Sequence, residues 1–198
     1  MHHHNFTRGF GFLETLLAKK RARVAEWLIV PNLRDGRVLD IGCGSFPYFL
    51  STTRFKEKYG VDGSIDETLF QKSPIKLKKL NVEITNLTFS NNFFDVVIML
   101  AVFEHIHPEF IHKVLNDIYR VLKKDGQLII TTPSPWSVPL LWTLSRVGFI
   151  SKVEINDHKH AYTHKKIIKL MRNAGFSKDR IEHGYFELTL NMWFIARK

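Results

Sequence analysis

Two glycines and two aspartates stand where a bound ligand would meet the chain. Gly42 and Gly44 directly follow the short apolar run Val-Leu-Asp-Ile at 38–41, which is typical of a buried strand. Ligands of open α/β sheets bind beyond the carboxyl ends of the strands, and glycine allows the tight turn and the close backbone approach that this requires. Asp62 ends the next strand, 22 residues after Asp40, near the spacing of roughly 20 residues expected for an acid that holds ribose hydroxyls. The pattern predicts a ligand that contains a nucleoside.

The same loop indicates which nucleoside it takes. A dinucleotide fingerprint requires a small residue at position 47, where this chain has Pro47, and Phe46 crowds the place where a pyrophosphate would meet the following helix. Asp40 lies two residues before Gly42, and its carboxylate repels phosphates but suits an ammonium group. S-adenosylmethionine fits these residues, because it has ribose, adenine, a sulfonium and an α-amino group but no phosphate.

Three histidines are candidates for acid–base chemistry on an acceptor. His105 follows the fourth expected strand, and His158 and His160 end a proline-interrupted segment. A neutral imidazole accepts a hydroxyl proton near pH 7, since its ordinary pKa is about 6.5. We expect at least one of the three to reach the transferred group, while a polar loop position or a helix cap is the plainer interpretation of each.

The cysteine content excludes several kinds of site. Cys43 is the single cysteine, so the chain forms no intramolecular disulfide and no cysteine-based zinc site. Its place within the glycine loop indicates a small packing residue rather than a nucleophile. We expect no bound metal and a reducing, cytoplasmic setting.

Apolar runs and helical stripes alternate along most of the chain, as in a three-layer α/β fold. The first helix is amphipathic and basic, with apolar residues at Leu13, Leu16, Leu17, Val24, Trp27 and Leu28. Two further helices are expected over 111–122 and after Thr163, which can cap a helix. The expected strands are 37–41, 58–61, a weaker one at 80–84, 95–100, 127–132, 181–188 and 191–196. The last two are joined by a short turn and are therefore expected to be antiparallel.

The order of several motifs extends this interpretation. They are Val-Leu-Asp-Ile-Gly-Cys-Gly at 38–44, Gly-Val-Asp-Gly-Ser at 60–64, the stretch 87–97, Val-Phe-Glu-His at 102–105, Tyr-Arg-Val-Leu-Lys-Lys-Asp-Gly at 119–126, and the elements 158–163 and 174–176. This series resembles the core of class I S-adenosylmethionine-dependent methyltransferases, in particular the type 11 group that includes ubiquinone- and menaquinone-biosynthesis-like enzymes. One departure is Phe46, which stands where the family usually has a third glycine.

The resemblance implies a fold and a set of cofactor contacts. The fold is a Rossmann-like three-layer sandwich whose seven-stranded sheet is mostly parallel, with the last strand antiparallel. Asp62 would hold the ribose, and Glu83 would bond the adenine amino group, with Asn81 as the alternative. The positions expected to line the cofactor are Asp40, Gly42, Cys43, Gly44, Asp62, Gly63, Ser64, Glu83, Ile84, Leu100 and Ala101. S-adenosylhomocysteine would be the product.

We expect one domain of four parts. These are the basic amphipathic helix within 1–33, the cofactor-binding core 34–132, an acceptor-side insertion 133–160, and a C-terminal helix and strand pair at 161–198. The apolar residues between 134 and 150 are interpreted as core, as a cap over an acceptor pocket, or as a patch that rests on lipid. No membrane-spanning or targeting segment stands out, and the histidine run at 2–4 is set aside as a tag remnant or a native feature.

Composition and charge bear on the partner. The 198 residues are 44% hydrophobic and 24% charged, which excludes a disordered chain or a small disulfide scaffold. The formal net charge of +10 makes weak contact with an anionic membrane or with nucleic acid an expectation. The leading hypothesis is O- or N-methylation of a small-molecule, saccharide or lipid-linked acceptor. An RNA methyltransferase and a non-catalytic S-adenosylmethionine-binding protein are the alternatives.

Overall fold

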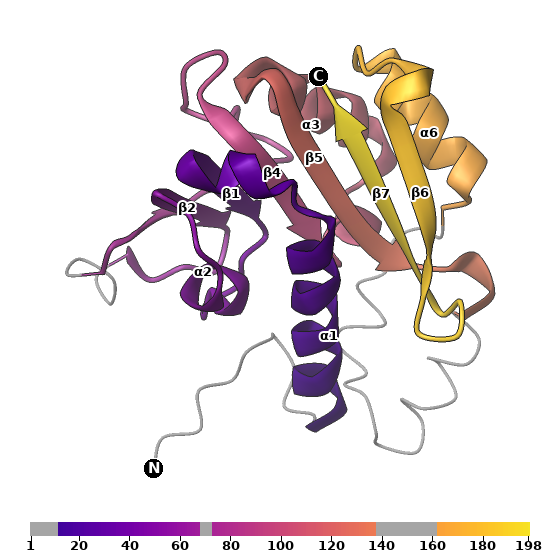
Figure 1. Cartoon of the computed structure of the whole chain (residues 1–198), viewed down its shortest axis with the longest axis horizontal. Helices are drawn as coiled ribbons and strands as arrows, with labels where there is room; N and C mark the ends of the chain where they lie inside the picture. The colour runs from indigo at the N-terminus through magenta and orange to yellow at the C-terminus, as the bar shows by residue number, and fades with distance from the viewer. Residues whose placement is uncertain (1–11, 68–72, 138–161) are drawn as a thin grey trace.

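A single seven-stranded sheet organises the chain. The computed structural model describes residues 12–67, 73–137 and 162–198 (Figure 1). The strands run in the order β3-β2-β1-β4-β5-β7-β6. Strands β1 to β5 pair in parallel, and β7 is antiparallel to both β5 and β6. Their bounds are β1 Arg37–Ile41, β2 Glu57–Asp62, β3 Ile75–Lys79, β4 Phe94–Leu100, β5 Leu122–Pro133, β6 Ile181–Phe186 and β7 Asn191–Arg197. The expected sheet with one antiparallel strand is confirmed.

Helices cover both faces of this sheet. On β4, Val97 and Met99 pack in the cluster that contains the buried residues of α3 and α6, whereas Val96 and Ile98 pack with those of α1 and α2. The apolar run of β4 from 96 to 99 is thereby buried on both sides, and the result is the expected three-layer sandwich (Figure 1). The helices are α1 Phe12–Leu28, α2 Tyr48–Thr52, α3 Pro108–Val121 and α6 His164–Asn173, with 3-10 turns at η1 Pro31–Asp35, η3 Phe103–His105, η4 Pro135–Ser137 and η5 Lys178–Arg180.

The third, fifth and sixth expected strands differ most in their bounds. The fifth begins at Leu122 rather than at 127, directly after α3 ends at Val121. The third strand is 75–79 and not 80–84, since the backbone after Leu80 forms a turn in which the Thr85 amide donates to the Asn81 carbonyl. On this edge strand only one face meets the core, so lysines alternate with Ile75 and Leu77 and mask the apolar signal. The sixth strand ends at Phe186 rather than at 188, because the next residues lie in a left-handed turn.

Helix α1 forms as expected, but its packing face differs from the expected apolar stripe. Ala22, Ala25 and Leu28 are its buried residues, whereas Leu16 and Trp27 are 41% and 76% exposed. The small alanine side chains let the helix lie close against the sheet, and of the expected stripe Leu28 is buried and Val24 is partly buried. Within the described ranges, no helix has the length and apolar character to cross a membrane. Of the insertion expected at 133–160, positions 138–160 lie outside the described residues.

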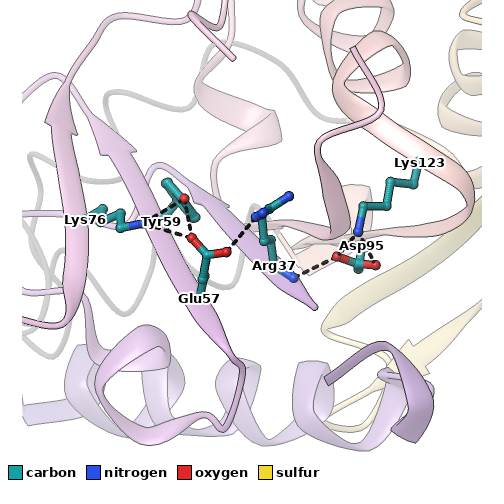
Figure 2. A network of polar contacts seen from close by, with 6 residues as sticks. All are labelled: Arg37, Glu57, Tyr59, Lys76, Asp95 and Lys123. Atoms are coloured by element: carbon teal, nitrogen blue, oxygen red, sulfur yellow. Dashed lines mark hydrogen bonds and ion pairs between the residues drawn. The ribbon is translucent and has the colours of Figure 1, made fainter. Parts of the chain in front are cut away.

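A network of ion pairs fastens the amino ends of the parallel strands (Figure 2). The Glu57 carboxylate accepts from Arg37 Nε at 2.8 Å, from the Tyr59 hydroxyl at 2.7 Å and from Lys76 Nζ at 2.8 Å. Asp95 accepts hydrogen bonds from the Arg37 amide at 2.7 Å and from Lys123 Nζ at 2.8 Å. Because these residues come from β1, β2, β3, β4 and β5, the network fixes five neighbouring strands at the edge opposite to the glycine loop.

The network predicts a pH dependence of stability. Lys76, then Tyr59 and Arg37, lower the pKa of Glu57 from 4.5 to about 2. Since the folded pKa is the lower one, the stabilisation is complete above pH 4.5 and is lost as the pH falls toward about 2. We expect Glu57→Gln to flatten this part of the unfolding free-energy profile, measured by urea denaturation across that range. Profiles of equal steepness for the two proteins would contradict the assignment.

Candidate cofactor and acceptor site

The glycine loop leaves β1 in a conformation that only glycine adopts there. Gly42 has a φ of +76°, and its amide donates to the Val61 carbonyl at 2.8 Å. A Cβ at this position would lie 2.3 Å from the Val102 side chain. The turn therefore combines positive φ with close packing against the segment that follows β4.

Asp62 ties the loop after β1 to the loop after β2. Its Oδ2 accepts from the Gly44 amide at 3.0 Å, and its Oδ1 accepts from the amide and the hydroxyl of Ser64 at 2.8 and 2.6 Å. The residue is 5% exposed. The carboxylate is thus held in one orientation at the carboxyl end of β2.

A second buried carboxylate stands beside it. Asp40 on β1 is 4% exposed, and burial raises its pKa well above the ordinary value, with the charge of Asp62 as the next cause. Two carboxylates that are both ionised repel each other here, and a positive group near them relieves that repulsion. The arrangement favours a cationic ligand at the carboxyl ends of β1 and β2.

The space around these acids allows such a ligand to approach the backbone. A Cβ added at Gly44 or at Gly63 would meet nothing within 4 Å. Gly44 follows Asp40 by four residues, and Gly63 directly follows Asp62. Both acids are expected from the sequence to bind the ligand. The open space and the acid pair fit S-adenosylmethionine, whose ammonium and sulfonium are positive and whose ribose offers two hydroxyl donors.

The end of β4 forms the neighbouring part of the site. Leu100 is the last residue of β4 and pairs with Thr131 of β5. Ala101 follows with a φ of +55°, which is uncommon for a residue other than glycine, and its amide donates to the Thr131 carbonyl at 2.9 Å. The left-handed residue turns the chain out of the sheet toward η3.

The two residues expected at the adenine lie in the turn after β3. Glu83 Oε1 accepts from the His107 amide at 2.6 Å, next to the start of α3. Asn81, the alternative, accepts from the Glu83 amide through Oδ1 at 2.9 Å. Ile84 is 73% exposed, a large apolar side chain open to solvent beside Glu83. Glu83 therefore also orders the segment that leads into α3, a role that the sequence did not predict.

A buried glutamate, Glu104, is a candidate site residue that was not expected from the sequence. Glu104 in η3 is 3% exposed, and its Oε2 accepts from the Thr132 hydroxyl at 3.0 Å. Its Oε1 is also covered, and no hydrogen-bond donor reaches it among the described residues. Glu104 appeared in the sequence only within the motif Val-Phe-Glu-His, where glutamate at a turn gives no sign of burial.

His105 is the candidate base that the structure describes. It ends η3 in a partly buried position, and its amide donates to the Val102 carbonyl at 3.0 Å. The ring of Phe103 in the same turn packs edge-on against Tyr162 at 5.2 Å between centroids. His158 and His160 lie outside the described residues, so the face-to-face placement of the three histidines stays a prediction.

Cys43 occupies the loop as a packing residue. It belongs to the core cluster on the α1 side of the sheet, and burial, with the charges of Asp40 and Asp62 added, raises the pKa of its thiol. A thiol that stays protonated is a poor nucleophile. In the described ranges, no group of three or more residues of metal-binding type comes together.

A comparison with protein families identifies the family of this chain. A family model described as a methyltransferase domain covers residues 9–180. The chain belongs to the methyltransferase domain family. An uncharacterized protein of Methanocaldococcus jannaschii is 36% identical over 99 residues, which are 50% of this chain and 41% of that protein. The chain thus spans well under two thirds of the length of this curated relative.

Solved methyltransferases share the fold. A S-adenosylmethionine-dependent methyltransferase from Archaeoglobus fulgidus superposes with a TM-score of 0.69 at 17% identity, over 92% of this chain and 94% of the other. Phosphoethanolamine N-methyltransferase 2 of Haemonchus contortus, in complex with phosphomonomethylethanolamine and S-adenosylhomocysteine, gives 0.65 at 17%, over 91% and 52%. The family model confirms the expected methyltransferase family, and the solved S-adenosylmethionine-dependent methyltransferases confirm the expected fold.

The position of Asp62 leads to a binding prediction. Asp62→Ala removes the acceptor for the ribose hydroxyls, and a hydrogen bond to a charged group contributes about 1.5–3 kcal/mol. We expect the affinity for S-adenosylhomocysteine, measured by calorimetric titration, to fall about ten- to a hundredfold. Asp35→Ala is the matched control, since it removes an exposed aspartate of η1 at the opposite edge of the sheet. Undiminished affinity in a folded Asp62→Ala protein would overturn the assignment.

Proposed function

We propose that this domain transfers the methyl group of S-adenosylmethionine to an oxygen or nitrogen of a small-molecule, saccharide or lipid-linked acceptor. The cofactor supplies the methyl group in activated form on its sulfonium. The residues of the chain bind the cofactor, orient the acceptor and receive a proton where the acceptor loses one.

The observation that carries the acceptor proposal is the buried oxygen of Glu104 that no described donor satisfies. A buried carboxylate oxygen without a donor is costly, and a group that brings an N–H or O–H to it recovers that cost. Glu104 lies where β4 and β5 end, because it follows β4 by four residues and bonds to Thr132 of β5. A hydroxyl or amine acceptor that reaches Glu104 would be held at the same edge of the sheet as Asp40 and Asp62.

The cofactor side of the proposal assigns three contacts. Asp62 would accept from the ribose hydroxyls, Asp40 would face the ammonium group, and Glu83, next to the open apolar side chain of Ile84, would accept from the adenine amino group. Holding an acceptor against the methyl group in line supplies a large part of the rate enhancement by orientation alone, about 7–11 kcal/mol in favourable cases. An amine acceptor needs little more than this.

A hydroxyl acceptor benefits from a base, and His105 is the described candidate. We expect His105→Ala, His158→Ala or His160→Ala, in at least one case, to lower methyl transfer about 10²–10⁴-fold. The affinity for S-adenosylhomocysteine should stay unchanged in that variant, and His112→Ala, an exposed position on α3, is the control. Full transfer activity in all three variants would contradict the proposed histidine base. Orientation of the acceptor would then be the source of catalysis.

The acceptor class is tested by methyl uptake from labelled cofactor. A small-molecule extract, a lipid fraction and total RNA are offered separately to the protein, and we expect label in the small-molecule or lipid fraction. Glu104→Gln, which keeps the shape of the side chain, should lower this uptake while cofactor affinity is preserved.

The second candidate, an RNA methyltransferase, is favoured by the net charge of +10. Label that enters only RNA and is released by ribonuclease would replace the proposed acceptor with this one. No uptake in any fraction, together with measurable cofactor binding, would favour a non-catalytic S-adenosylmethionine-binding protein.

A further inference from the structure

The outer side of α1 carries a stripe of exposed apolar and basic residues. Leu16, Lys20, Arg23 and Trp27 are all exposed, and their spacing of four, three and four residues places them along one side of a helix. The two ends of the stripe are large and apolar, with Trp27 76% exposed, and the two central residues are cations. The opposite side of α1 is the one that packs on the sheet, through Ala22 and Ala25.

A second segment extends this stripe. Lys20 Nζ lies 3.2 Å from Glu187 Oε1, so the turn between β6 and β7 sits beside α1. Glu187, Leu188 and Thr189 have φ values of 53°, 52° and 68°, a left-handed turn that leaves Leu188 91% exposed. The ring of Trp27 also contacts Trp193 of β7 edge-on, at 6.5 Å between centroids. We call Leu16, Lys20, Arg23, Trp27 and Leu188 the apolar–basic face.

The chemistry of this face matches an anionic lipid surface. Tryptophan and leucine beside lysine and arginine are typical of helices that lie in the interface of a bilayer, where the apolar side chains enter the headgroup region. Each cation near an anionic membrane contributes roughly fivefold to the affinity at low salt. A nucleic acid would engage Lys20 and Arg23 but would leave the exposed Leu16 and Leu188 without a partner.

The apolar–basic face lies near the carboxyl ends of the parallel strands, where the candidate site is. The turn at 187–190 meets the carboxyl end of β5, since Asn191 pairs with Pro133 and the Ser134 amide donates to the Leu190 carbonyl at 2.9 Å. That end of the sheet is the one that carries the candidate site. A surface that binds the apolar–basic face would therefore lie next to the acceptor side.

We propose that the apolar–basic face docks this domain peripherally onto an anionic bilayer. The inference goes beyond the proposed function, because it concerns a surface and holds for any acceptor. Its test needs neither cofactor nor acceptor, so its failure would leave the assignment of methyl transfer untouched.

The experiment is sedimentation of the full chain with vesicles. We expect binding to vesicles of phosphatidylcholine with phosphatidylserine, little binding to phosphatidylcholine alone, and a loss of affinity as salt rises. Arg23→Glu replaces a cation with an anion and should lower the affinity on the order of twentyfold. Trp27→Ser and Leu188→Asn should also weaken binding, and asparagine tolerates the left-handed conformation at 188.

Two matched controls lie on the opposite layer. Lys165→Glu on α6 makes the same change of charge at an exposed position, and Tyr185→Ser removes a 51% exposed aromatic residue that packs beside His164. Both should bind as the wild type does, and thermal unfolding checks that every variant is folded. The proposal is overturned by absent binding to anionic vesicles, by equal losses in the controls, or by losses with Arg23→Glu alone. That last result would mark a general cation site such as one for RNA.

Discussion

The burial of two neighbouring carboxylates is the constraint on which the candidate site depends. Asp40 lies one residue before the end of β1, and Asp62 ends the adjacent parallel strand β2. Both are almost fully buried. The amide of Gly44 and the two donors of Ser64 compensate Asp62, while Asp40 keeps a raised pKa. A pair of this kind is costly to the protein alone and less costly beside a positive group, which supports the proposal of a positively charged ligand.

The amino ends of the strands carry the ion pairs that stabilise the sheet, and the carboxyl ends carry the candidate site. At the amino ends, Glu57 and Asp95 bind cations from neighbouring strands and fasten them together (Figure 2). At the carboxyl ends, the turns contain left-handed residues at Gly42, Gly44 and Ala101 and a carboxylate oxygen of Glu104 that no described donor satisfies. The unsatisfied hydrogen-bonding capacity of Glu104 lies where a ligand can use it, and the opposite edge holds the strands in register.

The sequence predicted the parts of the molecule in which local pattern and tertiary context agree. The apolar run of β4 is buried on both faces, and Gly42 lies where positive φ and close packing exclude other residues. Prediction failed where context overrides pattern. Lysines on an edge strand masked β3, and alanines took the packing face of α1 that larger residues were expected to fill. The burial of Glu104 depends on Thr132, a contact across 28 residues that no local spacing encodes.

The central claim, that Asp40 recognises the positively charged amino-acid part of a nucleoside ligand, is tested most directly by comparing two ligands. Calorimetric titration of the wild type and of Asp40→Asn with S-adenosylhomocysteine and with 5′-methylthioadenosine, which lacks the ammonium group, separates this recognition from that of the nucleoside. The account predicts that the wild type binds S-adenosylhomocysteine at least about tenfold more tightly, as expected for a hydrogen bond between charged groups, and that Asp40→Asn reduces this preference. Equal affinity of the wild type for both ligands, or a preference that survives Asp40→Asn undiminished, would contradict it.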